Sequence, residues 1–215
     1  MGDPLTLRPY GARAVLVELP DAATRRALTG WLASIDHPTV AVIPAELTVL
    51  LDVSDLSIKE ADAQQELRLV TRDLAHLDLE ALPAADATDS KLVTVDVRYD
   101  GPDLETVAGQ LAMSADALIR WHTSTPWTVE FLGFMPGFGY LTRDDHDQQV
   151  ERRHSPRSAI PAGSVGFAGH YSAVYPRSSP GGWQLVGHTD QVMFDLTCGG
   201  AATAPNDRVQ FRSVR

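Results

Sequence analysis

Cysteine is almost absent from this chain of 215 residues. The single copy, Cys198, excludes an internal disulfide and a CxxC metal knuckle, and so little cysteine is typical of a protein from the reducing cytosol. The sequence also has no run of about 20 apolar residues and no basic stretch followed by an apolar one near its start. We therefore expect a cytoplasmic protein without a membrane partner.

Positive charge is scarce as well. The chain carries 18 Lys and Arg residues against 28 Asp and Glu, a formal net charge of -10, and its only lysines are Lys59 and Lys91. Such a surface repels the phosphate backbone of a nucleic acid, and no stretch dense in Lys and Arg with interleaved aromatic residues offsets the repulsion. Nucleic acid is therefore not expected as a partner.

The common catalytic motifs are missing. The chain has no GxxxxGK[ST] phosphate loop, no GxGxxG fingerprint, no HExxH zinc helix and no GxSxG nucleophile elbow. Residues 163–166, GSVG, lack the spacing of the last motif. Residues 144–147, DDHD, offer oxygen and imidazole ligands, but a solvated acidic loop is the preferred interpretation, and no metal site is predicted.

The composition is that of a globular protein, with 44% hydrophobic and 21% charged residues. Glycine is unevenly spread, because only 3 of the 16 glycines lie in residues 1–90. Residues 80–90 have no apolar periodicity and contain a proline, which indicates a linker. We predict an α+β fold, with a small N-terminal α/β domain over residues 1–85 and a second domain over residues 86–215.

In the first domain, residues 14–19 and 47–52 are short apolar runs that predict strands. Asp21 is a plausible N-cap for a helix that carries an apolar face. Ser57 and Glu60 have the spacing of a capping box at the start of a second helix. The apolar faces of the two helices are Leu28, Trp31, Leu32 and Ile35, and Ala63, Leu67, Val70 and Leu74.

In the second domain, residues 91–98 alternate between apolar and polar side chains, which predicts a half-exposed strand. Asp103 and Ser114 can each cap a short helix, and residues 127–132 return to a strand pattern. From Gly133 onward, short apolar runs alternate with Gly/Pro turns. This pattern favours a small closed barrel or sandwich.

Three loops are unusually rich in glycine and aromatic residues: residues 131–141, 160–166 and 179–183. Glycine lets a backbone approach a ligand closely and leaves amide donors open, and aromatic rings beside such donors supply an apolar wall. The alternative is that these loops are tight barrel corners packed with Phe and Trp. We expect the three loops to converge on one hollow that accepts a small anionic ligand.

Several motifs occur in an order that resembles one known family. They are YDGPDL at 99–104, WH at 121–122, GFMPGF at 133–138, SPR at 155–157, IPAGSVG at 160–166, VYP at 174–176, SPGGW at 179–183 and DRVQF at 207–211. The chain resembles the B subunit of 5-oxoprolinase, a family also called allophanate hydrolase subunit 1 that includes the kinase inhibitor KipI. The resemblance implies a cyclophilin-like β-barrel after the N-terminal domain.

The resemblance also implies an activity, which is the ATP-dependent hydrolysis of 5-oxo-L-proline to L-glutamate, with Mg²⁺ accompanying ATP. It implies that the chain works in a heteromeric complex with homologues of the C and A subunits of that enzyme. Two alternatives stay open. One is a KipI-like inhibitor that binds a sensor histidine kinase, and the other is a component of an allophanate or urea amide hydrolase.

Under the leading hypothesis, His122 is a candidate for proton transfer or orientation, and the guanidinium of Arg157 is a candidate anion contact. Packing or capping for His122, and an ion pair for Arg157, are the alternatives. Ser164 could donate to an oxyanion or cap its own turn. The candidate substrate-binding residues are Phe134, Pro136, Gly137, Phe138, Ser164, Tyr175, Pro180, Gly181, Gly182 and Trp183.

Besides a milder change at residues 205–208, where PNDR replaces the usual Pro-Gly-Asp-Arg, two segments depart from the family pattern. Residues 170–173, HYSA, stand where the family usually shows Lys-Gln-Thr-Gly, and residues 188–190, HTD, stand where Arg-Thr-Pro is expected. Both changes remove fixed positive charge or backbone freedom beside the expected cleft. They bear on the identity of the substrate more than on the fold.

Overall fold

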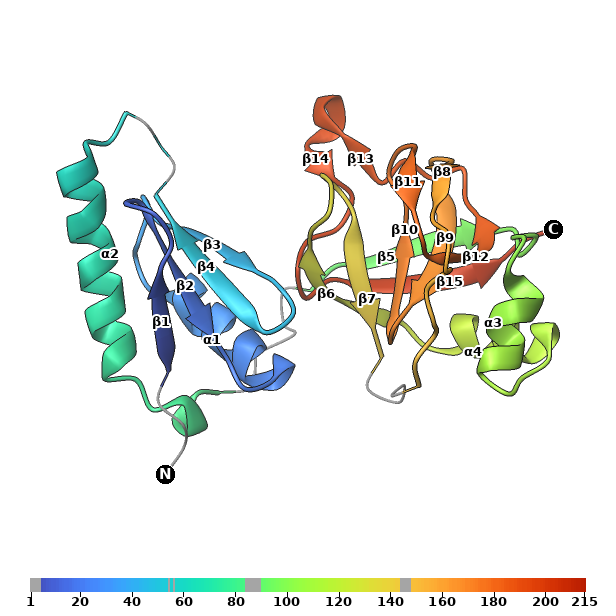
Figure 1. Ribbon diagram of the computed structural model, residues 1–215, viewed down its shortest axis with the longest axis horizontal. Coiled ribbons are helices and arrows are strands. Elements are labelled where there is room, and N and C mark those ends of the chain that lie inside the picture. The colour runs from blue at the N-terminus through green and yellow to red at the C-terminus, as the bar shows by residue number, and fades with distance from the viewer. Residues whose placement is uncertain (1–4, 54, 56, 84–89, 144–147) are drawn as a thin grey trace. The chain divides into compact units, whose positions relative to one another are not determined.

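The computed structural model describes residues 5–53, 55, 57–83, 90–143 and 148–215. The chain divides into two compact units, Met1–Asp89 and Ser90–Arg215 (Figure 1). Each has its own hydrophobic core. The predicted acidic stretch at 144–147 and part of the predicted linker lie outside the described residues.

The first unit is a four-stranded antiparallel sheet in the order β1-β2-β4-β3, with two helices. Alternate residues of the central strands, Val17, Val49 and Leu51, are fully buried and share one core with both helices. The elements are β1 (Thr6–Pro9), β2 (Ala14–Glu18), α1 (Ala22–Ser34), β3 (Ala41–Pro44), β4 (Thr48–Asp52), α2 (Glu60–Ala75) and the 3-10 turn η1 (Leu79–Ala81).

The two helices of this unit begin in different ways. The predicted N-cap of α1 is confirmed, since the Asp21 carboxylate accepts a hydrogen bond from Thr24 N at 2.7 Å. The predicted capping box of α2 is wrong. Lys59 is the N-cap and provides no side-chain bond, whereas Ser57 N donates to the carboxylate of Asp55 at 2.9 Å in the preceding turn. The apolar stripe of α2 is buried as predicted, because helical periodicity does not depend on the cap.

The second unit is a nearly closed barrel. Its seven-stranded sheet has the order β12-β9-β10-β7-β6-β15-β5, in which only the β15–β5 pair is parallel. The predicted fold class, α+β with a barrel after the N-terminal α/β domain, is confirmed. The strands are β5 (Leu92–Val97), β6 (Trp127–Leu132), β7 (Gly139–Thr142), β8 (Arg157–Ile160), β9 (Ser164–Ala168), β10 (Tyr171–Val174), β11 (Ser179–Gly181), β12 (Gln184–His188), β13 (Phe194–Asp195), β14 (Gly200–Ala201) and β15 (Arg208–Ser213).

The barrel is closed by residues 98–103, which follow β5 and run along β12. We call this contact the seam. Arg98 and His188 exchange two backbone hydrogen bonds of 2.9 Å, and Gly101 N donates to Val186 O at 3.1 Å. A Cβ at Gly101 would lie 2.3 Å from the carbonyl carbon of Val186, and one at Gly187 would lie 2.3 Å from Arg98 O. Glycine is therefore required on both sides of the seam.

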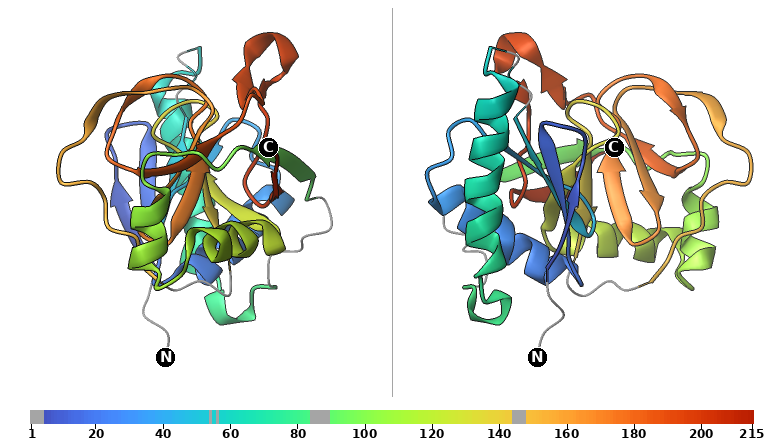
Figure 2. Two further views of the ribbon diagram at one scale, coloured as in Figure 1. Left: turned by 90° about the vertical axis from the view of Figure 1, so that its right-hand side faces the viewer. Right: turned by 60° about the vertical axis from the view of Figure 1, so that its left-hand side comes forward.

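Helices α3 (Leu104–Gln110) and α4 (Ala115–Ser124) lie together, away from the β13–β14 hairpin and the 3-10 turn η3 (Leu196–Cys198) within it (Figures 1 and 2). The predicted cap at Ser114 is confirmed, with Ala117 N donating to its hydroxyl at 3.2 Å. Asp103 is the N-cap of α3, as predicted, but its side chain makes no capping hydrogen bond, because its carboxylate is used elsewhere. Val93, Val95 and Val97 of β5 point into the barrel core, as their alternation predicted.

No helix within the described ranges is long and apolar enough to cross a membrane.

Candidate functional site

The three glycine-rich loops meet at one end of the barrel unit. Residues 133–138 join β6 to β7, residues 161–163 join β8 to β9, and β11 leads through residues 182–183 into β12. Aromatic rings from different loops touch: the ring centroid of Phe138 lies 5.3 Å from that of Trp183 and 5.1 Å from that of Tyr175. Segments far apart in the sequence therefore form a single cluster.

These rings are packed against each other rather than spread around an opening. Phe138, Tyr175 and Trp183 are 1%, 1% and 5% exposed, and they share a core with Ile160 and Leu185. Burial, the largest effect, raises the pKa of the Tyr175 hydroxyl to about 12. The rings therefore form a packed core beside the loops. This agrees with the alternative that the loops are tight barrel corners packed with Phe and Trp.

Phe134 is placed differently from the other rings. It is 60% exposed, and its backbone has a φ of +64°, a conformation that an aromatic residue rarely adopts. Its ring meets that of Phe138 edge to face at 5.4 Å. It borders an open apolar hollow of about 450 Å³, the loop hollow, which is lined by Leu132, Gly133, Phe134, Met135, Pro136, Gly137, Phe194 and Ala201.

Two predicted glycines are demanded by close packing. Gly137 has a φ of +82°, and a Cβ there would lie 2.6 Å from the Cβ of Phe194. A Cβ at Gly181 would lie 2.8 Å from the hydroxyl of Tyr175. Pro180 is exposed beside it, and the carbonyl of Gly182 accepts a hydrogen bond from Arg153 N at 2.8 Å. Close packing within and around the loops is therefore at least part of the reason why they contain glycine.

Arg157 forms an ion pair, the alternative considered for it. Its Nη2 lies 2.9 Å from both carboxylate oxygens of Asp103, and its Nη1 donates to the carbonyl of Trp183 at 3.4 Å. Arg153 Nη1 donates to the same carboxylate at 3.0 Å. Burial raises the pKa of the Asp103 carboxyl, but the hydrogen bond from Arg157 and the other donors outweigh it, so that this pKa is lowered.

Ser164 begins β9 and is 5% exposed. Its carbonyl accepts from Tyr175 N at 2.9 Å, and its own N–H donates to Pro161 O at 3.3 Å. Its backbone therefore belongs to the sheet and to the adjacent turn, beneath the same loop end.

His122 lies in the barrel core and is 0% exposed. Its Nδ1 is 2.6 Å from the hydroxyl of Tyr99, its Nε2 is 2.9 Å from the hydroxyl of Ser172, and its ring stacks on Phe211 at 4.1 Å. Ser172 belongs to one of the segments that depart from the family pattern. Because both ring nitrogens face protein hydroxyls, the geometry favours packing and positioning over direct contact with a ligand.

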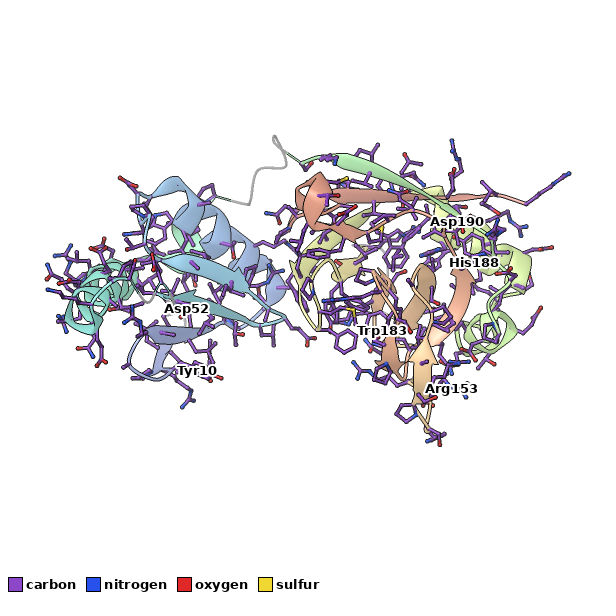
Figure 3. The ribbon with its side chains drawn as sticks, turned by 90° about the horizontal axis from the view of Figure 1, so that it is seen from above. Tyr10, Asp52, Arg153, Trp183, His188 and Asp190 are labelled. Atoms are coloured by element: carbon purple, nitrogen blue, oxygen red, sulfur yellow. The ribbon has the colours of Figure 1, made fainter. Side chains whose placement is uncertain are left out.

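A polar network that no sequence motif predicted lies at the seam. Arg98 Nε donates to His188 Nε2 at 2.9 Å, and Arg98 Nη2 pairs with Asp190 at 3.1 Å. Since arginine only donates, Nε2 of His188 is the acceptor, and Nδ1 carries the proton that it shares with Asp100 at 2.8 Å. The network borders a second hollow of about 320 Å³. Figure 3 shows His188 and Asp190 together, apart from Arg153 and Trp183.

Sequence reasoning missed Asp103 and Arg153 as site residues. The run of residues 151–157, ERRHSPR, is an unusual concentration of arginine in an acidic chain and was the available signal. Asp103, the carboxylate partner of Arg153, lies 50 residues earlier in the chain, and no local pattern connects the two residues. Within the described part of the chain, no three His, Cys, Asp or Glu side chains are grouped so as to hold a metal ion.

Fold and geometry together define a two-unit α+β protein whose barrel carries a candidate site, formed by loops, at one end. The chain belongs to the family described as carboxyltransferase domain, subdomain C and D, which it matches over residues 5–202.

Its curated relatives agree with the predicted resemblance to the B subunit of 5-oxoprolinase, which is confirmed. The chain is 43% identical to the 5-oxoprolinase B subunit of Escherichia coli O157:H7 over 110 residues, 50% of each chain. It is 45% identical to the protein of that name from Bacillus subtilis (strain 168) over 107 residues, 48% of this chain and 45% of the relative. The chain thus spans about half the length of the curated relatives it matches.

Solved structures extend the likeness. TTHA0988 is 28% identical, with a TM-score of 0.72 over 98% of this chain and 40% of its own. The conserved uncharacterized protein PH0987 from Pyrococcus horikoshii is 27% identical, with a TM-score of 0.54 over 97% of both chains. The K. lactis urea amidolyase, at 19% identity and a TM-score of 0.72, shares the fold over 100% of this chain and 15% of its own.

Proposed function

We propose that this chain is a cytoplasmic component of an ATP-dependent 5-oxoprolinase complex, which hydrolyses 5-oxo-L-proline to L-glutamate together with homologues of the enzyme's C and A subunits. The names of its relatives support this proposal. The structural observation that carries it is the meeting of three glycine-rich loops and two arginines at one end of the barrel.

The reaction has a clear chemical difficulty. A five-membered lactam is a stable amide, and its nitrogen is a poor leaving group. Transfer of the terminal phosphoryl group of ATP to the amide oxygen makes the ring carbon a better electrophile. Water then attacks that carbon and the carbon–nitrogen bond breaks, which opens the ring to an acyl phosphate. A second water hydrolyses this acyl phosphate to the carboxylate of glutamate and free phosphate. The protein's contribution is to position the reactants and to stabilise negative charge on the phosphoryl and carbonyl oxygens.

The residues at the loop end suit those tasks in different ways. Arg157, 22% exposed in its side chain, offers fixed positive charge. Phe134, Pro136 and Gly137 line the loop hollow, where an apolar ring face can lie. Phe138, Ser164, Tyr175 and Trp183, which are buried, hold these groups in place, as do Gly181 and Gly182 with Pro180 at the neighbouring turn. His122 acts from the core as a positioning residue.

Reconstitution tests the proposal. The chain is combined with its two partner proteins, the A-type and C-type homologues, and glutamate release from 5-oxo-L-proline is followed with and without ATP. We expect release only when ATP and all three proteins are present. We expect Arg157→Gln to slow it by roughly tenfold to a hundredfold. The control is Arg212→Gln, which removes an exposed arginine that pairs with Asp96 between strands β15 and β5.

Three outcomes would count against this assignment. Glutamate release that does not need the chain would remove it from the reaction. Conversion of allophanate by an assembly that leaves the lactam intact would favour the amide hydrolase alternative. Inhibition of a sensor histidine kinase by the chain alone, without glutamate release by the trio, would favour the KipI-like alternative.

A further inference from the structure

We propose that Arg153 and Arg157 together bind one anionic group, a carboxylate or a phosphate, and that Asp103 holds the two guanidinium groups in position for it. The choice of ligand rests on the function proposed above, whereas the site itself rests on the geometry of these three residues. Arg157, which the sequence analysis proposed as an anion contact, is one of the two arginines of this site.

The two guanidinium groups share a single carboxylate oxygen. Arg153 Nη1 lies 3.0 Å from Oδ1 of Asp103, and Arg157 Nη2 lies 2.9 Å from the same atom. Planar forks of this kind recognise carboxylates and phosphates through paired hydrogen bonds. Two forks held side by side by one atom present a larger donor surface than either would alone.

Asp103 is itself fixed. It is 5% exposed, its Oδ2 accepts a hydrogen bond from Leu185 N at 2.7 Å, and its own N–H donates to Leu185 O at 2.9 Å. Both bonds belong to the seam that closes the barrel. The carboxylate is therefore fixed to the seam, and the side chains of the two arginines that it holds are positioned by the seam as well as by their own segments.

Charge at this point is unbalanced. Among the residues that the structure describes, two positive groups face one carboxylate, in a chain whose formal net charge is -10. Two guanidinium groups this close repel each other, and a second anion would relieve that repulsion. Arg152 adds to the positive potential, since it and Arg157 both lower the pKa of the Tyr175 hydroxyl against the larger effect of burial.

Most of the donors of the pair are unused by the protein. Each guanidinium has five N–H donors. Arg153 makes one side-chain hydrogen bond to the described residues, and Arg157 bonds only Asp103 and the Trp183 carbonyl among them. Nε of Arg153 is buried without a partner in the described ranges. The side chains are 35% and 22% exposed, so a ligand can reach them.

The pair is also attached to the loop end of the barrel. Arg153 N donates to Gly182 O at 2.8 Å, and Arg157 Nη1 reaches the carbonyl of Trp183. Figure 3 shows Arg153 and Trp183 in the same part of the barrel unit. An anion held by the two arginines would thus lie beside the predicted substrate-binding loops.

Isothermal titration calorimetry of the purified full chain tests the proposal with two probes, inorganic phosphate and 5-oxo-L-proline. We expect the unmodified protein to bind at least one of them. Arg153→Gln and Arg157→Gln should each weaken that binding by about tenfold or more. Arg153→Lys, which keeps the charge but loses the fork, should give intermediate binding.

Arg212→Gln, the matched control, should bind like the unmodified protein. Circular dichroism confirms that each variant is folded.

The outcomes separate the ligand sources and the two proposals. Binding of phosphate alone assigns the pair to the nucleotide, and binding of the lactam acid alone assigns it to the substrate carboxylate. Failure of both probes to bind, or equal binding by folded Arg153→Gln, overturns the anion site, even if the reconstituted complex releases glutamate. Binding that depends on both arginines, with no glutamate from the complex, leaves the anion site standing and refutes the proposed function.

Discussion

Arg98 and His188 are paired twice, once through their backbones and once through their side chains. Two backbone hydrogen bonds of 2.9 Å join them across the seam, and Arg98 Nε donates to the ring of His188 at 2.9 Å. The same stretch of seam contains Asp103, which holds the arginine pair. The segment that closes the barrel is therefore also the one that holds the arginine pair.

Widening the seam should destabilise the barrel. A methyl group at Gly187 would lie 2.3 Å from Arg98 O, and backbone cannot move aside cheaply, so Gly187→Ala should cost about 2 kcal/mol or more. Gly109→Ala is the control: in α3 its Cβ meets nothing within 4 Å, and it should stabilise by about 0.5–1 kcal/mol. Urea unfolding followed by tryptophan fluorescence, in a Trp31→Phe background that silences the first unit, measures both. Equal stability of the two variants would contradict this account of the seam.

His122 should matter for stability before it matters for chemistry. His122→Ala removes the ring stacked on Phe211 and deprives the hydroxyls of Tyr99 and Ser172 of their shared partner, at an expected cost of about 3 kcal/mol. His154→Ala, at an exposed position of the same unit, should change stability by less than about 0.5 kcal/mol. Thermal unfolding measures both. An unchanged melting temperature for His122→Ala, combined with loss of glutamate release, would instead support direct catalysis.

Sequence patterns predicted the regular elements well where periodicity was their cause. The stripe on α2 and the alternation in β5 reflect burial on one face, which a period of 3.6 or 2 records directly. The helix caps were less predictable. Ser57 and Asp103 are both suitable capping residues, but Ser57 N is engaged in an earlier turn, and the Asp103 carboxylate pairs with arginines 50 or more residues away.

The candidate site was predicted in part for the same reason. The three loops could be found by composition, and rings of the first and third pack together. The loop hollow, however, is lined by the first loop with Phe194 and Ala201, and not by all three loops. Whether a ring packs inward, like Phe138, or outward, like Phe134, depends on backbone conformation at single residues. The pairing of Arg153 with Asp103 depends on how strands distant in the sequence register across the seam, which no local motif encodes.

Phe134 should be held in a strained backbone conformation. Its φ of +64° costs an L residue about 1–2 kcal/mol, a penalty that glycine does not have. Phe134→Gly and Phe134→Ala both remove the ring, so the difference between them isolates the backbone. We expect the glycine variant to be more stable by about 1 kcal/mol in urea unfolding. A more stable alanine variant would show that the backbone is unstrained there.

Alkali should weaken the loop end through Tyr175. Burial raises the pKa of this hydroxyl to about 12 from its ordinary value of 10.0, so its contribution to stability is complete below pH 10.0 and is lost as the pH rises toward 12. Tyr175→Phe should therefore lose less stability than the unmodified protein over that interval. Urea midpoints measured at intervals between these pH values test this, and parallel losses in the two proteins would contradict it.

Acid should act on the same end of the barrel through Asp103. Burial raises the pKa of this carboxyl, but Arg157, Leu185 N and Arg153 together outweigh burial and hold the pKa below its ordinary value of 3.8. Its contribution to stability is therefore present above pH 3.8 and is lost as the pH falls through the lowered value.

Asp103→Asn should be less stable than the unmodified protein at neutral pH and should lose less stability on acidification, so that the two stability curves approach each other. Asp96→Asn is the control, since the pKa of its carboxyl is also lowered, but by an exposed pair with Arg212 that joins β5 to β15 rather than to β12. Urea midpoints from neutral pH down to acid test the difference, and an Asp103→Asn curve parallel to that of the unmodified protein would show that Asp103 does not couple charge to closure of the barrel.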